Sequence, residues 1–316
     1  MHNQCQKNQF TYNNLNLTST ECLLSGVVAG VAARTVTAPL ELIKTLFQLQ
    51  ETPISSTNEK GFHGVIDALI KLSRQEGFLS LWKGNGVGCL RLGPYSGLKF
   101  LLYDKLKLQV YQNELNASKR LFLGSLAGII ATVVTYPLDI VKTRMTVQKR
   151  GEVYKGTSDA LLKMLRKEGT HSLFKGLTPT LIGVIPFEGV QFAVYETLKE
   201  YTVDSRWPSW RWPESKLDSD AMDILVIGSL AGAAGQTVSY PFDLVRKRMQ
   251  VKGMIRSRYT GTVHCFCCVY REEGVGGLFK GSFPNLLRIG PYAAVVFFTY
   301  ESAKSFFLLN RRNSEE

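Results

Sequence analysis

A hexapeptide that occurs three times in this chain restricts its fold more strongly than any other feature. Its copies begin at Pro39, Pro137 and Pro241, which are 98 and then 104 residues apart. Each copy has a proline, an apolar residue, an acid, two apolar residues and a base, in that order. Internal repeats fix the architecture that every local interpretation must fit, so we interpret the chain as three similar units of about 100 residues.

Two further motifs recur in step with the hexapeptide. A Glu-Gly pair is followed by an aromatic residue with Lys-Gly, and a tyrosine with an adjacent acid and a lysine follows 27 residues after each glutamate. The glutamates are Glu76, Glu168 and Glu273, and the tyrosines are Tyr103, Tyr195 and Tyr300. The motifs place the repeats at 21–112, 119–202 and 221–308, with an N-terminal tail at 1–20, a Trp/Pro-containing loop at 203–220 and a C-terminal tail at 309–316.

Six segments come close to the length and apolarity that a membrane span requires. They run approximately over 22–49, 84–102, 121–147, 176–194, 221–251 and 281–298. Each contains closely spaced small residues, which let helices pack against one another in lipid. Pro39, Pro137 and Pro241 lie inside apolar spans, where we expect them to kink or break the helix. The sequence therefore predicts an all-α membrane protein with six transmembrane helices, a short amphipathic helix in each repeat, and a pseudo-threefold barrel around a central cavity.

Composition argues against several other functions. The formal net charge of +12 is spread over the repeats, and no zinc-finger, RNA-recognition or basic-zipper pattern is present, so we expect no nucleic-acid partner. His264, Cys265, Cys267 and Cys268 suggest a metal site, but adjacent cysteines do not readily close one tetrahedral site. The sister repeats also build this helix without cysteine. We expect no metal, no cofactor and no enzymatic activity, because no catalytic set of residues or phosphate-cradling loop occurs in a suitable context.

The recurring charges indicate two gates. In a ring of three repeats, the acid of each hexapeptide can reach the base of the neighbouring repeat and close one mouth of the cavity. These residues are Glu41, Lys44, Asp139, Lys142, Asp243 and Arg246. At the other mouth the corresponding residues are Asp104, Lys107, Glu196, Lys199, Glu301 and Lys304. Pairing within one helix would contribute only a few tenths of a kcal/mol, whereas two networks that break alternately are typical of a gated transporter.

These motifs resemble those of the mitochondrial carrier family, solute carrier family 25, from about Cys22 to Lys304. The resemblance implies three short matrix helices, multi-pass residence in the mitochondrial inner membrane, and alternating access by a monomer. It assigns the hexapeptide charges to a matrix gate and the tyrosine-motif charges to a cytosolic-side gate. It also implies a small anionic substrate and inner-membrane lipid as partners, with cardiolipin as the candidate lipid.

Other positions also match the family. Gln48 and Gln250 correspond to its glutamine braces, with Thr146 in the equivalent place of repeat two, and Tyr103, Tyr195 and Tyr300 correspond to its tyrosine braces. Leu46 departs from its counterparts Arg144 and Arg248, so we expect this second base to be dispensable for the gate.

Positions that differ among the repeats are the candidates for holding an asymmetric substrate. Counting back from the tyrosine-motif acids and from the prolines gives these cavity-facing candidates: Arg34, Arg91, Lys99, Gly183, Val184, Glu188, Gln191, Gln236 and Arg288. Arginine in a midmembrane cavity is costly without an anionic partner, and its planar donors match phosphate. The alternative interpretation is that the arginines pair internally, one of them with Glu188.

The cargo class follows from this layer and from the resemblance. Gly183 and Val184 leave room for a flat or bulky group, and they resemble the contact pattern of carriers of adenine nucleotides, coenzyme A and thiamine pyrophosphate. The arginine-methionine hexapeptide of the ADP/ATP exchanger is absent at 246–251, and no calcium-binding extension precedes the first helix. Two alternatives stay open: a proton or small-carboxylate carrier of the uncoupling type, and a non-transporting scaffold or receptor. The loop around Trp207, Trp210 and Trp212 suits either a membrane interface or a disordered segment.

Overall fold

The computed structural model describes residues 19–50, 64–110, 117–148, 153–204, 221–254 and 259–315, and within these ranges every regular element is a helix. The six long helices are α2 (Ser19–Leu49), α4 (Asn85–Val110), α5 (Ala117–Val147), α7 (Leu177–Asp204), α8 (Ala221–Gln250) and α10 (Ser282–Glu315). The short helices are α3 (Val65–Glu76), α6 (Thr157–Glu168) and α9 (Thr262–Leu278), with 3-10 turns η1 (Phe78–Trp82) and η2 (Thr170–Phe174).

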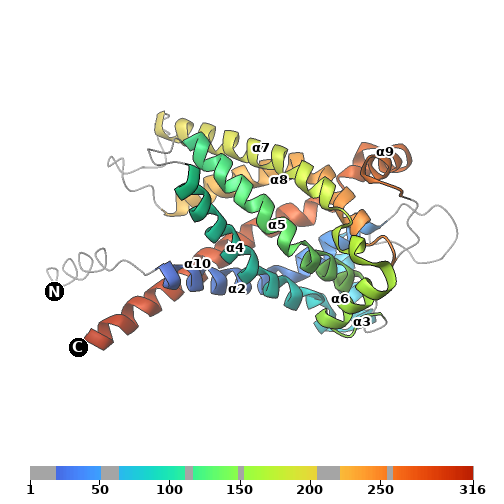
Figure 1. Ribbon diagram of the computed structural model, residues 1–316, viewed down its shortest axis with the longest axis horizontal. Helices are drawn as coiled ribbons and strands as arrows, with labels where there is room; N and C mark the ends of the chain where they lie inside the picture. Colours follow the sequence, from blue (N-terminus) through green and yellow to red (C-terminus); the bar gives the residue numbers. More distant parts are fainter. Residues whose placement is uncertain are drawn as a thin grey trace.

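The long helices run alongside one another, and the short helices gather at one end of the molecule (Figure 1). The start of α2 and the end of α10 lie at the opposite end. Neighbouring repeats meet where α4 packs on α5, α7 on α8, and α10 on α2. These three contacts close the repeats into a ring, and we call them seam 1–2, seam 2–3 and seam 3–1.

Each expected span falls on one of the long helices, to within one residue where a span extends beyond its helix. Two features differ from expectation. Helix α10 continues to Glu315, so residues 309–315 of the expected C-terminal tail are helical. Pro39, Pro137 and Pro241 each lie inside one continuous helix, so they do not break it. At Pro39 the carbonyl of Thr35, one turn earlier, has lost its backbone donor. The indole Nε1 of Trp82 donates to that carbonyl instead, at 2.8 Å. The Trp207–Trp212 loop lies outside the described residues.

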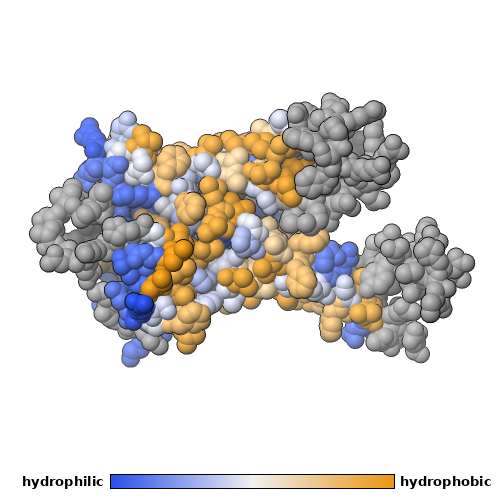
Figure 2. Space-filling view, turned by 180° about the vertical axis from the view of Figure 1, so that it is seen from behind, coloured by the Kyte–Doolittle hydropathy of each residue, from blue (hydrophilic) through white to orange (hydrophobic). Residues whose placement is uncertain are grey.

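The surface is apolar around the middle of the molecule and polar toward the ends (Figure 2). Large apolar side chains face outward there, including Ile185 (74% exposed) and Phe298 (73% exposed), whereas charged side chains cluster inside. Three helical segments are long and apolar enough to cross a membrane: Thr20–Leu49, Leu123–Val147 and Thr170–Leu198. This inverted polarity is expected for a protein whose outer solvent is lipid and whose interior is wet.

Glycines end the short helices in all three repeats. Gly77 and Gly169 follow α3 and α6 with φ of 84° and 77°, and Gly274 interrupts α9 with φ of 68°. This left-handed conformation costs a residue with a Cβ atom, so the Glu-Gly motif fixes where each short helix turns toward the next long helix. Because α9 bends at Gly274, its first part corresponds to α3 and α6.

Candidate functional site

Three ion pairs connect the three repeats at the end that carries the short helices. Lys142 binds Glu41 at 2.5 Å, and Lys44 binds Asp243 at 3.3 Å. Arg246 binds Asp139. Each acid therefore pairs with a base from another repeat, as the hexapeptide spacing predicted. Helices α2, α5 and α8 each contribute one acid and one base, so the pairs form a closed ring across the interior.

Two of the expected cargo-binding residues contact the acids of this ring. The Nη1 atom of Arg91 lies 2.6 Å from Oδ1 of Asp139, so that carboxylate holds two arginines. The Nε2 atom of Gln236 donates to Oδ2 of Asp243 at 2.7 Å. The interpretation that the arginines pair internally is thus correct for Arg91, but its partner is Asp139 rather than Glu188. Within the described residues Glu188 makes no ion pair.

Arg34 and Arg288 have buried donors that nothing in the described part of the chain accepts. The Nε and Nη1 atoms of Arg34 and the Nε atom of Arg288 have no hydrogen-bond partner there. Arg34 lies against α4, where a Cβ built at Gly88 would be 3.1 Å from its Nη1. Both arginines lie close enough to Glu41 to act on its charge. Buried guanidinium donors without acceptors are costly, so this region is suited to an anion.

Gly183 does not leave room for cargo on the side where its Cβ atom would lie, so that interpretation is wrong for this side of the residue. A Cβ atom at Gly183 would lie only 2.9 Å from Cβ of Phe242 on α8, and Gly183 itself is buried. Its lack of a side chain therefore allows α7 and α8 to approach closely. The sister hexapeptides carry leucine where Phe242 stands. The bulky residue of α8 and the glycine of α7 are complementary.

The remaining candidates of this layer occupy different surroundings. Gln191 packs against α8, because a Cβ at Gly235 would lie 3.2 Å from Cβ of Gln191. Lys99 is exposed, and its Cε lies 3.7 Å from the Cβ position of Gly128 on α5. Val184 and Glu188 are half-buried.

The charges of the tyrosine motifs do not form a second ring in this conformation. Asp104, Glu196 and Glu301 make no ion pair with Lys107 or Lys304 within the described residues, and the side chain of Lys199 lies outside them. Asp104 and Lys107 are exposed, whereas Tyr103, Tyr195 and Tyr300 are half-buried. In the described residues, the hexapeptide charges thus form a ring of ion pairs at one end, whereas the tyrosine-motif charges form no such ring.

The expected braces differ in what they contact. Gln250 is fully buried, accepts a hydrogen bond from Oγ1 of Thr143 at 2.7 Å, and donates to the hydroxyl of Tyr136 at 3.2 Å. Gln48 is also fully buried. Thr146, which replaces glutamine in repeat two, donates to the carbonyl of Lys142 in its own helix at 2.8 Å.

Sequence reasoning missed the partners of the second base of the hexapeptide. Arg144 is completely buried and binds both carboxylate oxygens of Glu168, and Arg248 binds Glu273 at 2.6 Å. Hydrogen bonds from Arg144 and Lys175 lower the pKa of Glu168 to about 2. Burial raises the pKa of Glu273, but hydrogen bonds from Arg248 bring it below its usual value. In repeats two and three the second base occurs together with the Glu-Gly motif, and that joint occurrence was the available signal.

Comparison with known proteins agrees with this architecture. The family described as "Mitochondrial carrier protein" matches the chain three times, over residues 15–114, 113–206 and 218–311. The chain belongs to the mitochondrial carrier family. This carrier is 37% identical to the mitochondrial adenine nucleotide transporter ADNT1 of Arabidopsis thaliana, over 89% of its own length and 85% of the relative's.

Two other relatives extend the comparison. The uncharacterized mitochondrial carrier YPR011C of Saccharomyces cerevisiae is 36% identical, over 88% of this chain and 89% of the yeast protein. The human mitochondrial adenyl nucleotide antiporter SLC25A25 is 35% identical over 89% of this chain, which spans 58% of the human protein's length. The carrier is accordingly a multi-pass protein of the mitochondrial inner membrane, and its family is one of transporters.

Proposed function

We propose that this carrier exchanges an adenine nucleotide, or a related phosphate-bearing cofactor of the coenzyme A or thiamine pyrophosphate type, by alternating access. The observation that carries the proposal is the pair of arginines, Arg34 and Arg288, which lie beside the ring of ion pairs and have buried donors without an acceptor in the described part of the chain. The names of the Arabidopsis and human relatives favour the adenine nucleotide within this class.

The charge balance around the ring supports an anionic cargo. The three acids of the ring pair with its own three bases, and in addition Arg91 binds Asp139 while Arg34 and Arg288 lie near Glu41. Basic side chains are therefore in excess in a region removed from bulk water. Guanidinium groups are planar and present paired donors, which match the oxygen atoms of a phosphate. A phosphate-bearing anion would satisfy the free donors and reduce the excess positive charge.

The position of Arg91 gives a way for cargo to act on the ring. Asp139 is held by Arg91 and Arg246 together. A phosphate group that draws Arg91 away would leave Asp139 with one partner and weaken the ring. We propose that the ring is the matrix gate, closed here, and that the tyrosine-motif charges form the cytosolic-side gate, open here.

The proposed arrangement in the membrane follows from the assignment of the ring of ion pairs to the matrix gate. Helices α2, α4, α5, α7, α8 and α10 would span the membrane, and α3, α6 and α9 would lie on the matrix side. The monomer is the proposed functional unit because three repeats complete one ring. Cardiolipin is the proposed lipid partner.

Exchange by the purified carrier in liposomes tests the proposal. The liposomes contain unlabelled ATP, and uptake of labelled ATP, ADP, AMP, coenzyme A, thiamine pyrophosphate, phosphate and dicarboxylates is measured. Saturable exchange of an adenine nucleotide is expected. Arg288→Gln should slow exchange at low substrate about tenfold or more, because a hydrogen bond to a charged group contributes about 1.5–3 kcal/mol.

The matched control is Arg74→Gln, the same substitution at an exposed site on α3. Normal nucleotide exchange by the Arg288→Gln variant would refute the assignment of Arg34, Arg91 and Arg288 to cargo binding. Proton or carboxylate flux without nucleotide exchange would favour the uncoupling type. Absence of all flux from a folded protein would favour a scaffold.

A further inference from the structure

The three repeats differ at several positions in and beside the hexapeptides, and three of these differences lie at one seam. Repeat one has Ala38 and Leu46 where its sisters have tyrosine and arginine, and repeat two has Thr146 where its sisters have glutamine. Ala38 and Leu46 lie near the matrix end of α2, and Thr146 lies near the matrix end of α5. The ends of α2 and α5 that carry these residues face each other at seam 1–2.

Seam 2–3 shows what the usual residues provide. Arg144 of repeat two donates to the carbonyl of Gln250 at 3.1 Å and to that of Lys252 at 2.9 Å in repeat three. The side chain of Gln250 bonds Thr143 and Tyr136 of repeat two. The end of α8 is therefore tied to repeat two through both its backbone and its side chains.

Seam 3–1 is tied in a similar manner. Arg248 of repeat three donates to the carbonyl of Gln48 at 3.1 Å, and Lys280 donates to the carbonyl of Gln50 at 3.4 Å. Both acceptors lie at the end of α2, so repeat three holds the last turn of the first helix.

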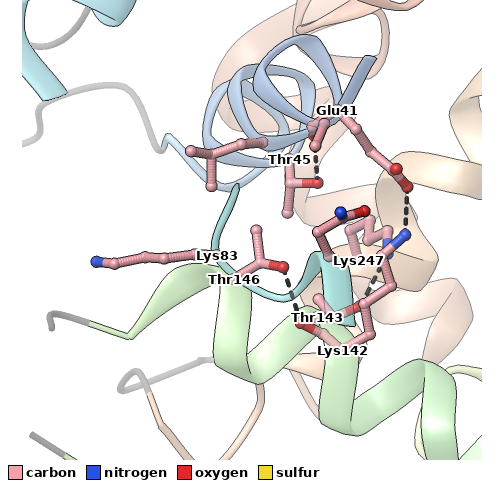
Figure 3. Close-up of a pocket in the computed structure, with 10 residues that line it drawn as sticks. Glu41, Thr45, Lys83, Lys142, Thr143, Thr146 and Lys247 are labelled. Carbon is pink, nitrogen blue, oxygen red and sulfur yellow. Dashed lines mark hydrogen bonds and ion pairs between the residues drawn. The ribbon is translucent and has the colours of Figure 1, made fainter. Parts of the chain in front are cut away.

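Seam 1–2 lacks most of these ties. Below the ring, Lys83 donates to the carbonyl of Gln148 at 3.1 Å, and in the described residues no second hydrogen bond from repeat one reaches the end of α5. A pocket occupies the place between Ala38 and Thr146 (Figure 3). The packing of α4 on α5 is also the least extensive of the three contacts between repeats in the described chain.

At the level of the ring, seam 1–2 is held by residues that cargo is proposed to engage. Lys142 binds Glu41, and Arg91 binds Asp139. When cargo binds Arg34, Arg91 and Arg288, the other two seams keep several hydrogen bonds to backbone carbonyls. Seam 1–2 keeps the hydrogen bond from Lys83 to the carbonyl of Gln148, but it loses the ion pair of Arg91 with Asp139. Cargo binding therefore weakens the seam that is already the least supported.

We propose that the matrix mouth opens first at seam 1–2, between the ends of α2 and α5, and that phosphate-bearing cargo passes along the pocket there. This inference rests on the proposed function. The pocket is lined by Ala38, Leu42, the Glu41 carboxylate that Lys142 binds, and these polar or basic side chains: Thr45, Lys83, Asn85, Lys142, Thr143, Thr146 and Lys247. The basic and hydroxyl groups among them suit a phosphate. Lys247 donates to Thr143 at 2.8 Å and has no carboxylate partner in the described residues. It is therefore available to an anion when the seam parts.

The test restores the missing ties. The double variant Leu46→Arg/Thr146→Gln places at seam 1–2 the residue types of the other seams. We expect a higher unfolding temperature and nucleotide exchange at least tenfold slower, which corresponds to about 1.4 kcal/mol of added resistance to opening. A higher unfolding temperature with an unchanged exchange rate would overturn the proposal, because the seam would then not need to part.

A second variant tests whether exchange requires seam 1–2 in particular or only one weakly held seam. Arg144→Leu/Gln250→Thr gives seam 2–3 the residue types of seam 1–2. Added to the restored variant, it should leave exchange slow, because the cation-lined pocket lies at the other seam. Recovery of the nucleotide exchange rate would show that any weakly held seam can open for cargo, and it would refute the assignment of the opening to seam 1–2.

Amide hydrogen exchange of the native carrier without cargo gives a measurement that needs no variant and no transport. We expect faster exchange at 143–148, the end of α5, than at 45–50 and 247–252, because fewer ties hold it. Equal protection of the three ends would refute the inference even if nucleotide transport is established. If amide hydrogen exchange is faster at 143–148 but the carrier transports no nucleotide, the proposed function is refuted. The inference that seam 1–2 is the least supported seam then still holds.

Discussion

Replacement of Arg248 by methionine is expected to destabilise the carrier by about 4 kcal/mol, the middle of the range for breaking a buried ion pair. The side chains of Arg248 and Glu273 are 3% and 2% exposed. Without the guanidinium, Glu273 keeps only the Lys280 ammonium, at 2.5 Å. The carbonyl of Gln48 in repeat one loses its donor as well. The loss combines an under-compensated carboxylate with an unsatisfied carbonyl, and each of these costs more than the net value of one hydrogen bond.

Thermal unfolding of the purified protein in detergent with added cardiolipin measures this effect. A loss of this size corresponds to a fall in midpoint temperature of the order of 10 °C. The double variant Arg248→Met/Glu273→Gln should lose less than the sum of the two single variants, because removal of the carboxylate also removes the need for its partner.

Arg74→Gln, at an exposed position of α3, serves as the control and should unfold at the temperature of the native protein. A loss below about 1 kcal/mol for Arg248→Met would place the pair among weak surface ion pairs. Additive losses in the double variant would show that Arg248 and Glu273 do not act on each other. Either result would refute the reasoning.

Three further predictions follow. Charge reversal at both Asp139 and Arg246 should retain more exchange than either single reversal, and liposome exchange that is equally low in all three variants would count against their pairing. Gly183→Ala should cost about 1–3 kcal/mol of stability through overpacking against α8, whereas Gly189→Ala on the same helix, with nothing within 4 Å of the new Cβ, should be nearly neutral in thermal unfolding. The pKa of Glu168 is lowered from 4.5 to about 2, so its contribution to stability is complete above pH 4.5 and is lost as the pH falls toward 2; Glu168→Gln should flatten the dependence of unfolding temperature on pH in that window.

The ring of ion pairs could be predicted from the sequence because the threefold repeat indicates which helices are neighbours. An acid and a base three residues apart in one helix are ambiguous, but three copies around an axis make each acid the neighbour of another repeat's base. Lys142 with Glu41 and Lys44 with Asp243 follow that rule. The same argument could not find Gln236 on Asp243, because that contact has no counterpart in the sister repeats.

Gly183 shows why a single sequence misleads about space. A missing side chain can mean an open cavity or a close approach between backbones, and the two have the same sequence. Which of the two applies at Gly183 depends on Phe242, which lies in repeat three. The sister repeats carry leucine at the position of Phe242. Arg144 shows a related limit: its partner Glu168 recurs with it in the sequence, but the carbonyl groups that it also binds carry no sequence signal.

Helix α10 has 34 residues and is therefore about 51 Å long at 1.5 Å per residue. The hydrocarbon layer of a bilayer is about 30 Å thick, so about two fifths of α10 would stand outside it when the helix spans the membrane as proposed. The helix ends at the same end of the molecule as the start of α2, away from the short helices (Figure 1). A tether or fluorescent protein attached at the end of α10 would therefore be carried clear of the lipid by the helix itself, next to the proposed cytosolic-side gate. For surface-immobilised measurements, this attachment leaves the proposed matrix gate, at the ends of α2, α5 and α8, unobstructed.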